Sequence, residues 1–162
     1  VSLQLGLIVL QVARQAAVGS DLETLAAMAR DMIGRSHVYF VVDTLEYLHR
    51  NGRIGGAARL LGSALDLKPV LQICDGAVAP LTRVRTRRKA LAKVQELLEQ
   101  QISAGDRVHL GILNIDCRED AARLGQKLEE RFATVELLEN ECSPVVGTHA
   151  GPGTVGVAFY VE

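Results

Sequence analysis

The sequence lacks tryptophan and has few aromatic residues of any kind, which make up 4% of its 162 residues. Aromatic platforms on which bases of single-stranded nucleic acid could stack are therefore scarce. Neither sign of charge is in excess, because 18 lysine and arginine residues stand against 19 aspartate and glutamate residues. Such a balance gives no overall field that attracts nucleic acid or an anionic membrane, so any such attraction has to be local.

Cysteines and long apolar runs are also scarce. Cys74, Cys117 and Cys142 are an odd number of thiols without a CxxC pair, which argues against a disulfide framework or a zinc site. We expect a reducing, cytoplasmic setting. The apolar run from Leu5 to Leu10 is far shorter than the ~20 residues that span a bilayer, and no basic segment precedes it. We therefore expect no stable insertion into a membrane.

What the sequence does have is enough apolar material for one core. Hydrophobic residues make up 48% of the chain and charged residues 23%, a balance that is typical of a compact domain. A chain of this length buries roughly 70% of the surface that its unfolded form exposes, so it needs neither disulfides nor a metal to stabilise a core. We expect residues 1–162 to form a single domain.

Helical patterns occupy much of the chain. Apolar residues on every face of the first segment predict a buried helix. Ser20 and Glu23 have the spacing of a capping box for the second helix, and Thr86 is placed to cap a long amphipathic one. The predicted helices cover residues 3–18, 21–34, 45–50, 54–65, 87–102 and 118–132.

Six strands are predicted between these helices. Asp75 and Gly76 are the pair favoured in a two-residue type I′ turn and so predict a hairpin, and the glycine-rich segment 147–154 predicts a loop before the last strand. The elements together predict an α/β fold with a mixed, partly antiparallel six-stranded sheet flanked by helices. The predicted strands cover residues 37–42, 70–74, 77–85, 107–115, 134–138 and 155–161.

His149 is the first candidate for contact with a ligand. Gly147, Gly151 and Gly153 around it remove side chains and let the backbone approach a ligand closely. An imidazole can donate a hydrogen bond to a carboxylate, and its charge changes near neutral pH. The residues alone leave an alternative open, in which Gly-Pro-Gly builds a tight turn and His149 is a solvated loop residue.

A basic cluster follows the predicted hairpin and holds a third of the chain's 18 basic residues. It lies at the predicted start of a helix, where the macrodipole disfavours cations by a few tenths of a kcal/mol or more each. An acidic partner surface or a phosphate would offset that cost. The alternative is a solvated helix face paired with Glu96 and Glu99. The cluster comprises Arg83, Arg85, Arg87, Arg88, Lys89 and Lys93.

Aliphatic residues surround the sequence GRIGG at 52–56, and they fit either of two roles. Leucines at helical spacing are typical of an ordinary core. The same residues would also suit a tunnel for an alkyl tail, and only a void distinguishes the two roles. These residues are Leu45, Leu48, Ile54, Leu60, Leu61, Leu65 and Leu67.

Four stretches, LEYLHRNGRIG, KPVLQICDG, RVRTRRKALAK and GTHAGPG, occur in an order and spacing that resembles the carboxy-terminal domain of the DegV family. Members of that family are bacterial fatty-acid-binding proteins, and the resemblance covers essentially the whole chain. It implies a bound long-chain fatty acid as the ligand, without a cofactor or a metal. It also implies a missing amino-terminal domain whose hydroxyl groups bind the carboxylate, and the absence of a first methionine agrees with this.

The resemblance assigns a role to each candidate group. His149, Thr148 and Arg53 would lie at the carboxylate end of the fatty acid. The residues that would line its tail are Leu45, Leu48, Ile54, Leu61 and Leu65. The residues that would face an anion or a partner are Arg83, Arg85, Arg87 and Arg88. The implied partner is the catalytic subunit of a fatty acid kinase, which phosphorylates the bound carboxylate, so the chain itself would not be an enzyme.

Two other functions remain open at this point. The first is an enzyme in which the glycine-rich loop and the arginine cluster hold a phosphorylated metabolite and His149 is the nucleophile or the acid/base. No GxxxxGK[ST], HExxH or GxSxG sequence supports it. The second is a domain that is inactive without its partner domain, exposes apolar surface along residues 3–18 and associates with itself.

Overall fold

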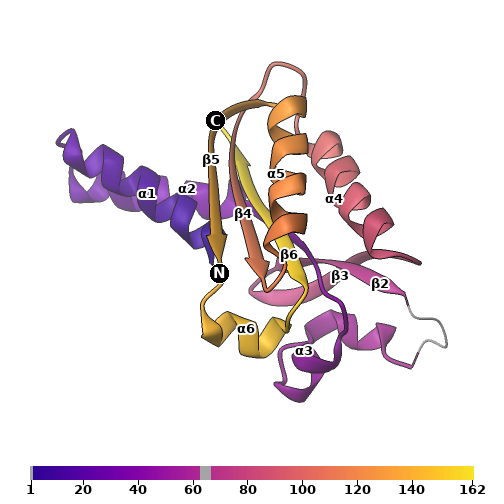
Figure 1. The fold of residues 1–162 in the computed structure, drawn as a ribbon. Coiled ribbons are helices and arrows are strands. Elements are labelled where there is room, and N and C mark those ends of the chain that lie inside the picture. Colours follow the sequence, from indigo (N-terminus) through magenta and orange to yellow (C-terminus); the bar gives the residue numbers. More distant parts are fainter. Residues whose placement is uncertain (1, 63–66) are drawn as a thin grey trace.

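The computed structural model of the chain describes residues 2–62 and 67–162. Within them, six strands form one sheet in the order β3-β2-β1-β6-β4-β5 (Figure 1). Strands β4 and β5 are parallel and the other neighbouring pairs are antiparallel, which confirms the predicted mixed sheet. The strands are β1 (His37–Val41), β2 (Lys68–Cys74), β3 (Ala77–Val84), β4 (Arg107–Ile115), β5 (Ala133–Glu141) and β6 (Thr154–Val161).

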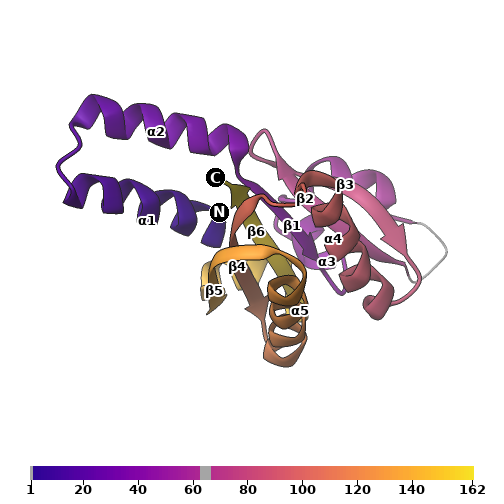
Figure 2. The ribbon, with the colours of Figure 1, turned by 90° about the horizontal axis from the view of Figure 1, so that it is seen from above.

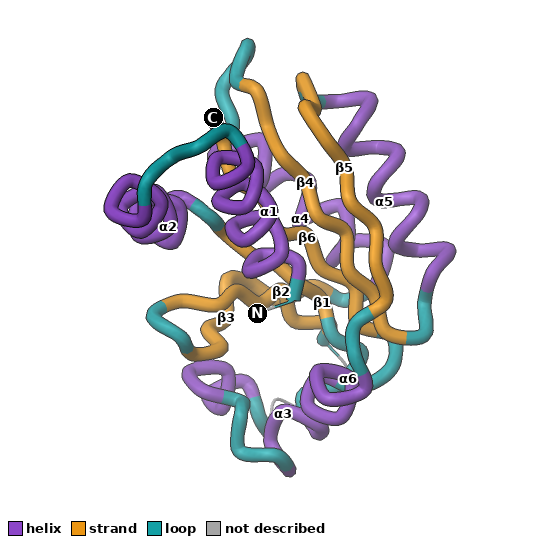
Figure 3. The backbone as a smooth tube through the Cα atoms, turned by 90° about the vertical axis from the view of Figure 1, so that its left-hand side faces the viewer, coloured by secondary structure: helices purple, strands orange, loops and turns teal. Residues whose placement is uncertain are grey.

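Helices cover both faces of the sheet (Figures 1 and 3). Two long helices, α4 (Arg87–Gln101) and α5 (Arg118–Arg131), pack on one face. On the other face the hairpin of α1 (Leu3–Ala17) and α2 (Leu22–Arg35) lies at one end of the sheet. The other end of that face carries three short helices, which are α3 (Glu46–Arg50), the 3-10 helix η1 (Gly55–Leu60) and α6 (Pro144–Ala150).

The central strands are buried on both faces because helices cover both. In β1, Tyr39 and Val41 join the core beneath α4 and α5, whereas Val38 and Phe40 point to the opposite face. Successive side chains of a strand alternate between faces, so a strand covered on both sides carries an almost continuous apolar run. The prediction of a buried strand from the sequence HVYFVV is confirmed.

The predicted turn and one predicted cap are confirmed. Asp75 and Gly76 have φ values of 50 and 76 between β2 and β3, as a type I′ turn requires. The Thr86 side chain accepts a hydrogen bond from the backbone N–H of Lys89 at 3.3 Å and caps α4. The predicted capping box at Ser20 is wrong, because Asp21 is the residue that caps α2.

The prediction that the first helix is buried on all sides is also wrong. Within α1 only Leu7 and Ile8 are buried, and Leu5 and Val9 are each 56% exposed. The hairpin of α1 and α2 extends beyond the sheet (Figure 2), and no described element covers the side of α1 that carries Leu5 and Val9. An apolar pattern shows that a face can be buried, but the length of the sheet decides whether it is.

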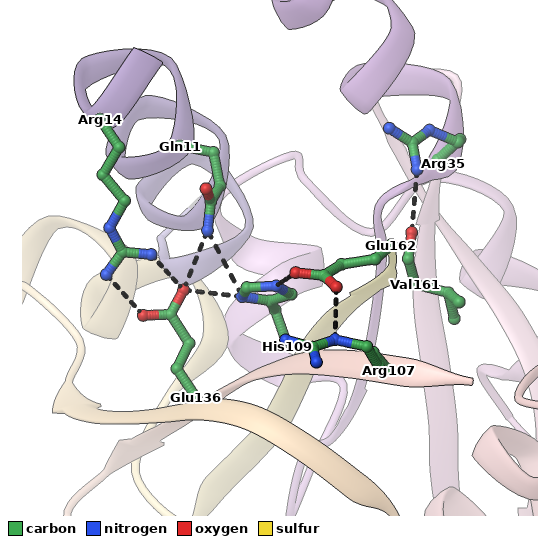
Figure 4. Close-up of polar contacts among 8 residues, drawn as sticks. All are labelled: Gln11, Arg14, Arg35, Arg107, His109, Glu136, Val161 and Glu162. Atoms are coloured by element: carbon green, nitrogen blue, oxygen red, sulfur yellow. Dashed lines mark hydrogen bonds and ion pairs between the residues drawn. The ribbon is translucent and has the colours of Figure 1, made fainter. Parts of the chain in front are cut away.

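A polar network attaches α1 to the edge of the sheet (Figure 4). The imidazole of the buried His109 on β4 lies between two carboxylates, with Nδ1 2.8 Å from Glu136 Oε1 and Nε2 3.0 Å from Glu162 Oε1. Arg14 of α1 donates two hydrogen bonds of 2.9 Å to Glu136. Chiefly through the hydrogen bond from Arg14, the pKa of Glu136 lies below its usual value. Charge therefore supplements the limited apolar contact of α1.

Candidate functional site

A cavity of about 510 Å³ lies between the sheet and the three short helices, on the face opposite α4 and α5. Its volume is within the range of roughly 300 to 1,000 Å³ that is typical of small-molecule sites. Apolar side chains provide most of its wall. The void that would separate a ligand tunnel from an ordinary core is therefore present in the structure.

Strands form the floor of the cavity. Val38 and Phe40 of β1, Ile73 of β2 and Leu113 of β4 all line it. On β6, Gly156 lies opposite both Phe40 and Leu113. A Cβ at Gly156 would come within 2.9 Å of Phe40 Cβ and 3.0 Å of Leu113 Cδ1. The absence of a side chain at Gly156 allows these two residues to pack closely across β6.

The GRIGG sequence forms part of the opposite wall. Leu48 of α3 is buried and lines the cavity, and so do Arg53 and Gly55. Gly55 has a φ of +50, and a Cβ there would collide with the carbonyl oxygen of Val78 in β3. Glycine at 55 therefore lets the start of η1 lie directly against the β2–β3 hairpin.

His149 lies in the last turn of α6, and the predicted loop begins later than expected. Pro144 occupies the start of this helix, where its missing N–H costs nothing. Gly151 ends the helix with a φ of 83, a conformation that favours glycine. The prediction of a loop is therefore wrong for residues 147–150 and holds for 151–153, and the imidazole is carried by a helix.

The imidazole of His149 lies at the wall of the cavity. Its Nδ1 is buried and has no hydrogen-bond partner among residues 2–62 and 67–162. A buried polar atom without a partner costs about 1–3 kcal/mol, so most such atoms in folded proteins are paired. His149 thus combines a place at the cavity with a buried nitrogen that no described residue satisfies.

The other two predicted carboxylate contacts differ from each other. Arg53 lines the cavity and is exposed, and its guanidinium donates a hydrogen bond of 3.4 Å to the backbone oxygen of Asn51. Thr148 is exposed and does not line the cavity, because its hydroxyl donates to the Pro144 carbonyl of its own helix at 2.9 Å. The structure thus brings Arg53 and His149 to one cavity and turns Thr148 away from it.

The predicted tail-lining residues are only partly brought together. Leu48 lines the cavity, whereas Leu45 and Ile54 belong to the apolar cluster behind it. Leu61 is 40% exposed and takes no part in the wall, and Leu65 lies outside the described residues. The family resemblance predicts that the helical leucines line the tail, and the apolar pattern of the strands predicts only that the strands belong to the core. The lining residues that it missed are Val38, Phe40, Ile73, Val78, Leu113 and Val146.

Arg87 does not belong with the exposed arginines of the basic cluster. Its Nε donates to Asp120 at 2.5 Å and its Nη1 to Asp43 at 3.0 Å, and its side chain is 23% exposed. Burial alone would lower the pKa of Arg87, but the hydrogen bond to Asp120 and the charge of Asp43 outweigh it and raise the pKa. The prediction that Arg87 faces a partner is corrected, while Arg83, Arg85 and Arg88 are exposed.

The Gly-Pro-Gly turn does not offer an open cradle for a phosphate. A Cβ at Gly151 would collide with the ring of Tyr47, and one at Gly153 would collide with the carboxylate of Asp43. Protein side chains thus occupy the space beside both glycines, and one of them carries negative charge. This packing bears on the glycine-rich loop alone, and the phosphometabolite alternative also rests on the arginine cluster and His149.

Other kinds of site find little support in the part of the chain that the structure describes. No group of three or more histidine, cysteine, aspartate or glutamate side chains there is arranged to hold a metal ion. None of the helices described combines the length and the apolar character needed to cross a bilayer. The three cysteines are free thiols.

The fold and the site together define an α/β domain with an apolar pocket beside a mixed sheet, and three comparisons place it in a family. The model of the DegV family, described as an uncharacterised protein family, matches residues 1–162. A DegV domain-containing protein of Deinococcus radiodurans is 36% identical over 160 residues, which are 98% of this chain and 57% of the relative.

Two solved structures agree with this match. One, described as the fatty acid binding of a DegV family protein from Thermus thermophilus, has a TM-score of 0.95 and 33% identity and covers 99% of this chain and 58% of that one. The other, a DegV family protein from Ruminococcus gnavus with vaccenic acid, has a TM-score of 0.82 and 26% identity and covers 94% of this chain and 55% of that one.

The chain therefore belongs to the DegV family, and the resemblance inferred from its four motifs is confirmed. Its mixed six-stranded sheet is the architecture of the DegV structures. The chain spans about half the length of the curated relatives that it matches.

Proposed function

We propose that this chain binds one long-chain fatty acid and presents its carboxylate to the catalytic subunit of a fatty acid kinase. The tail occupies the cavity and the carboxylate lies beside His149. The observations that carry this proposal are an apolar cavity that His149 lines and a buried Nδ1 of the same residue that no described residue pairs. The Thermus and Ruminococcus relatives, with their fatty acid ligands, support this class of ligand.

Energetics assign different roles to the two ends of the ligand. Burying about fifteen methylenes at about 0.8 kcal/mol each contributes on the order of 12 kcal/mol before the costs of association. A hydrogen bond to a charged head group contributes about 1.5–3 kcal/mol. The tail therefore determines most of the affinity, and His149 with Arg53 orients the carboxylate.

In this proposal the chain is not the catalyst. The kinase transfers the γ-phosphoryl group of ATP to a carboxylate oxygen, which gives an acyl phosphate and ADP, and this chain holds the acid during the transfer. Exposed guanidinium groups of Arg83, Arg85 and Arg88 supply charge for an acidic partner surface or a nucleotide phosphate. No resident cofactor is required, and free thiols are in keeping with a cytoplasmic setting.

The full-length protein that we expect has two domains. An amino-terminal domain would supply hydroxyl groups that donate hydrogen bonds to the carboxylate, whereas this domain holds the tail. Because the Thr148 hydroxyl donates to the Pro144 carbonyl of its own helix, it is not available to the carboxylate. In this proposal the amino-terminal domain supplies the hydroxyl groups instead.

The proposal is tested by replacing His149 with alanine. The full-length protein as purified is expected to carry a fatty acid that native mass spectrometry detects. In His149→Ala, affinity for palmitic acid is expected to fall by roughly ten- to a hundredfold, the loss of one hydrogen bond to a charged group, while the tail keeps most of the binding free energy. Formation of acyl phosphate with the kinase subunit and ATP is expected to be lost.

His49→Ala is the control, because His49 is exposed on α3 and does not line the cavity. It is expected to leave binding and acyl phosphate formation unchanged. A wild-type chain that binds no palmitic acid contradicts the proposal. So does a His149→Ala chain that loses binding but keeps its rate of phosphoryl transfer for each bound lipid.

A further inference from the structure

Arg87 connects three separate parts of the fold. It is the first residue of α4, and its guanidinium contacts Asp43, which follows β1, and Asp120 in the first turn of α5. The same Nη1 that reaches Asp43 also donates to the carbonyl oxygen of Gly153 at 2.5 Å. Arg87 therefore holds the Gly-Pro-Gly turn as well as two carboxylates.

That turn is fixed on its other sides too. The N–H of Gly153 donates to the carbonyl of Ile115, the last residue of β4, at 2.8 Å. The Asp43 side chain fills the space where a Cβ of Gly153 would lie. The N–H of Gly153 is thus bonded to β4 and its carbonyl to Arg87, and the Asp43 carboxylate packs directly beside it.

Hydrogen bonds extend from the turn into the end of α6. The hydroxyl of Thr154 donates to the carbonyls of Gly151 at 2.8 Å and Ala150 at 3.2 Å. The N–H of Gly151 donates to the carbonyl of Gly147 at 2.8 Å. Ala150 is the neighbour of His149, so the last turn of α6 is attached to the segment that Arg87 holds.

We propose that Arg87 is a positioning residue for His149, which it holds at the wall of the cavity through the Gly151–Gly153 turn, so that the site recognises a charged carboxylate. The inference rests on the proposed function and adds a specificity for the head group. Arg87 touches no part of the ligand. Its effect passes through backbone hydrogen bonds of the turn and of Thr154.

The shape of the side chain explains why arginine stands at this position. A guanidinium presents donors on several nitrogens in a planar fork, so Nε can bond Asp120 while Nη1 bonds Asp43 and Gly153. A lysine has a single nitrogen and cannot reach the three acceptors in the same way. Lysine is therefore expected to preserve the charge but only part of the geometry.

The test compares the binding of palmitic acid with that of its methyl ester, which has the same tail and no charge. In Arg87→Met, the preference for the acid over the ester is expected to fall by about tenfold, as expected for loss of a hydrogen bond to a charged group. Binding of the ester is expected to stay within about twofold. Arg87→Lys is expected to retain an intermediate preference.

Arg131→Met is the matched control. Arg131 also forms an ion pair, with Nε 2.8 Å from Glu99, but it lies at the end of α5 that is away from the turn. It is expected to leave the preference unchanged. Equal weakening of acid and ester by Arg87→Met would show a purely structural role and overturn the inference, and so would an unchanged preference.

A second measurement does not depend on a fatty acid. The 15N resonances of the His149 imidazole in the ligand-free chain are expected to shift in Arg87→Met and not in Arg131→Met. If the wild-type chain binds neither the acid nor the ester, the proposed function fails, and this shift still decides whether Arg87 positions His149. Unchanged imidazole resonances in Arg87→Met and Arg87→Lys would overturn the inference.

Discussion

At the scale of single residues, the candidate site requires glycine at several positions, and the physical reason for that requirement differs from one position to the next. Gly156 lets Phe40 and Leu113 approach each other, and Gly55 lets η1 lie on the carbonyl of Val78. Gly151 combines a positive φ with contact against the ring of Tyr47. Composition shows that glycine is common near the site, but only the structure separates conformational need from close packing.

Gly151→Ala separates these two effects when it is compared with Gly19→Ala. Gly19 has a similar φ of +93, and a Cβ there would meet nothing within 4 Å. Gly19→Ala is expected to lower the free energy of unfolding by about 1 kcal/mol through backbone strain alone. Gly151→Ala is expected to cost about 2 kcal/mol or more, because Tyr47 must also move.

Urea denaturation of both variants measures the difference between these two losses. Equal losses in the two variants would show that the Tyr47 ring accommodates a methyl group at no cost, contrary to its close packing against Gly151.

At the scale of elements, α6 presents one face to the cavity and another to solvent. Val146 lines the cavity, whereas its neighbour Val145 is 71% exposed. Residues one apart on a helix lie on different faces, so the pair distinguishes the two environments. The helix that carries His149 thus also supplies apolar wall for the tail.

Val146→Phe is expected to fill part of the cavity and to compete with the tail. Displacing about three methylenes at about 0.8 kcal/mol each would weaken the binding of palmitic acid on the order of fiftyfold. The melting temperature of the ligand-free chain is expected to stay the same or rise, because the new ring enters existing space.

Val145→Phe is the control on the same helix, and it is expected to leave the affinity unchanged. Isothermal titration and thermal unfolding measure the two quantities. Equal affinity in the Val146 variant and the wild type would mean that the tail binds elsewhere.

At the scale of the whole molecule, the hairpin of α1 and α2 extends beyond the sheet (Figure 2). Its anchor combines Leu7 and Ile8 with the contacts of Arg14 and His109. The outward side carries Leu5 and Val9, both exposed. Exposed apolar surface of this kind promotes association between copies of a chain.

Replacing Leu5 and Val9 together with glutamine is expected to reduce self-association without lowering the free energy of unfolding by more than about 0.5 kcal/mol. Sedimentation equilibrium measures the first quantity and urea denaturation the second. Leu7→Gln is the contrasting variant, because Leu7 is fully buried and its replacement is expected to destabilise the fold. Unchanged association in the double variant would locate the self-contact elsewhere.

The share of the fold and of the candidate site that the sequence predicts differs between these three scales. The six strands, the type I′ turn and the Thr86 cap follow from local patterns, which depend on residues close in sequence. The burial of α1 and the role of Arg87 do not follow from local patterns. The burial of α1 depends on how far the sheet extends, and the role of Arg87 depends on carboxylates that lie far away in the sequence. Arg87 shares its charge with Arg88, but only Arg87 meets Asp43 and Asp120.

The cavity shows the same limit. Val38, Phe40 and Leu113 are typical strand residues, and their sequence is equally compatible with a filled core. His149 was found because glycines surround it, and those glycines prove to serve the packing of a turn. A void arises from the relative positions of several elements, so no single segment contains a signal for it.

The central claim is that the cavity beside His149 binds the alkyl tail of a fatty acid, and the most direct test is to locate the bound tail. In the complex of the 13C-labelled chain with unlabelled palmitic acid, intermolecular NOEs locate the tail. Cross-peaks to Val38, Phe40 and Leu113, with a shift of the His149 Nδ1 resonance, are the result that we predict. Cross-peaks to Leu5 and Val9 on the open side of α1, with His149 unperturbed, would contradict it.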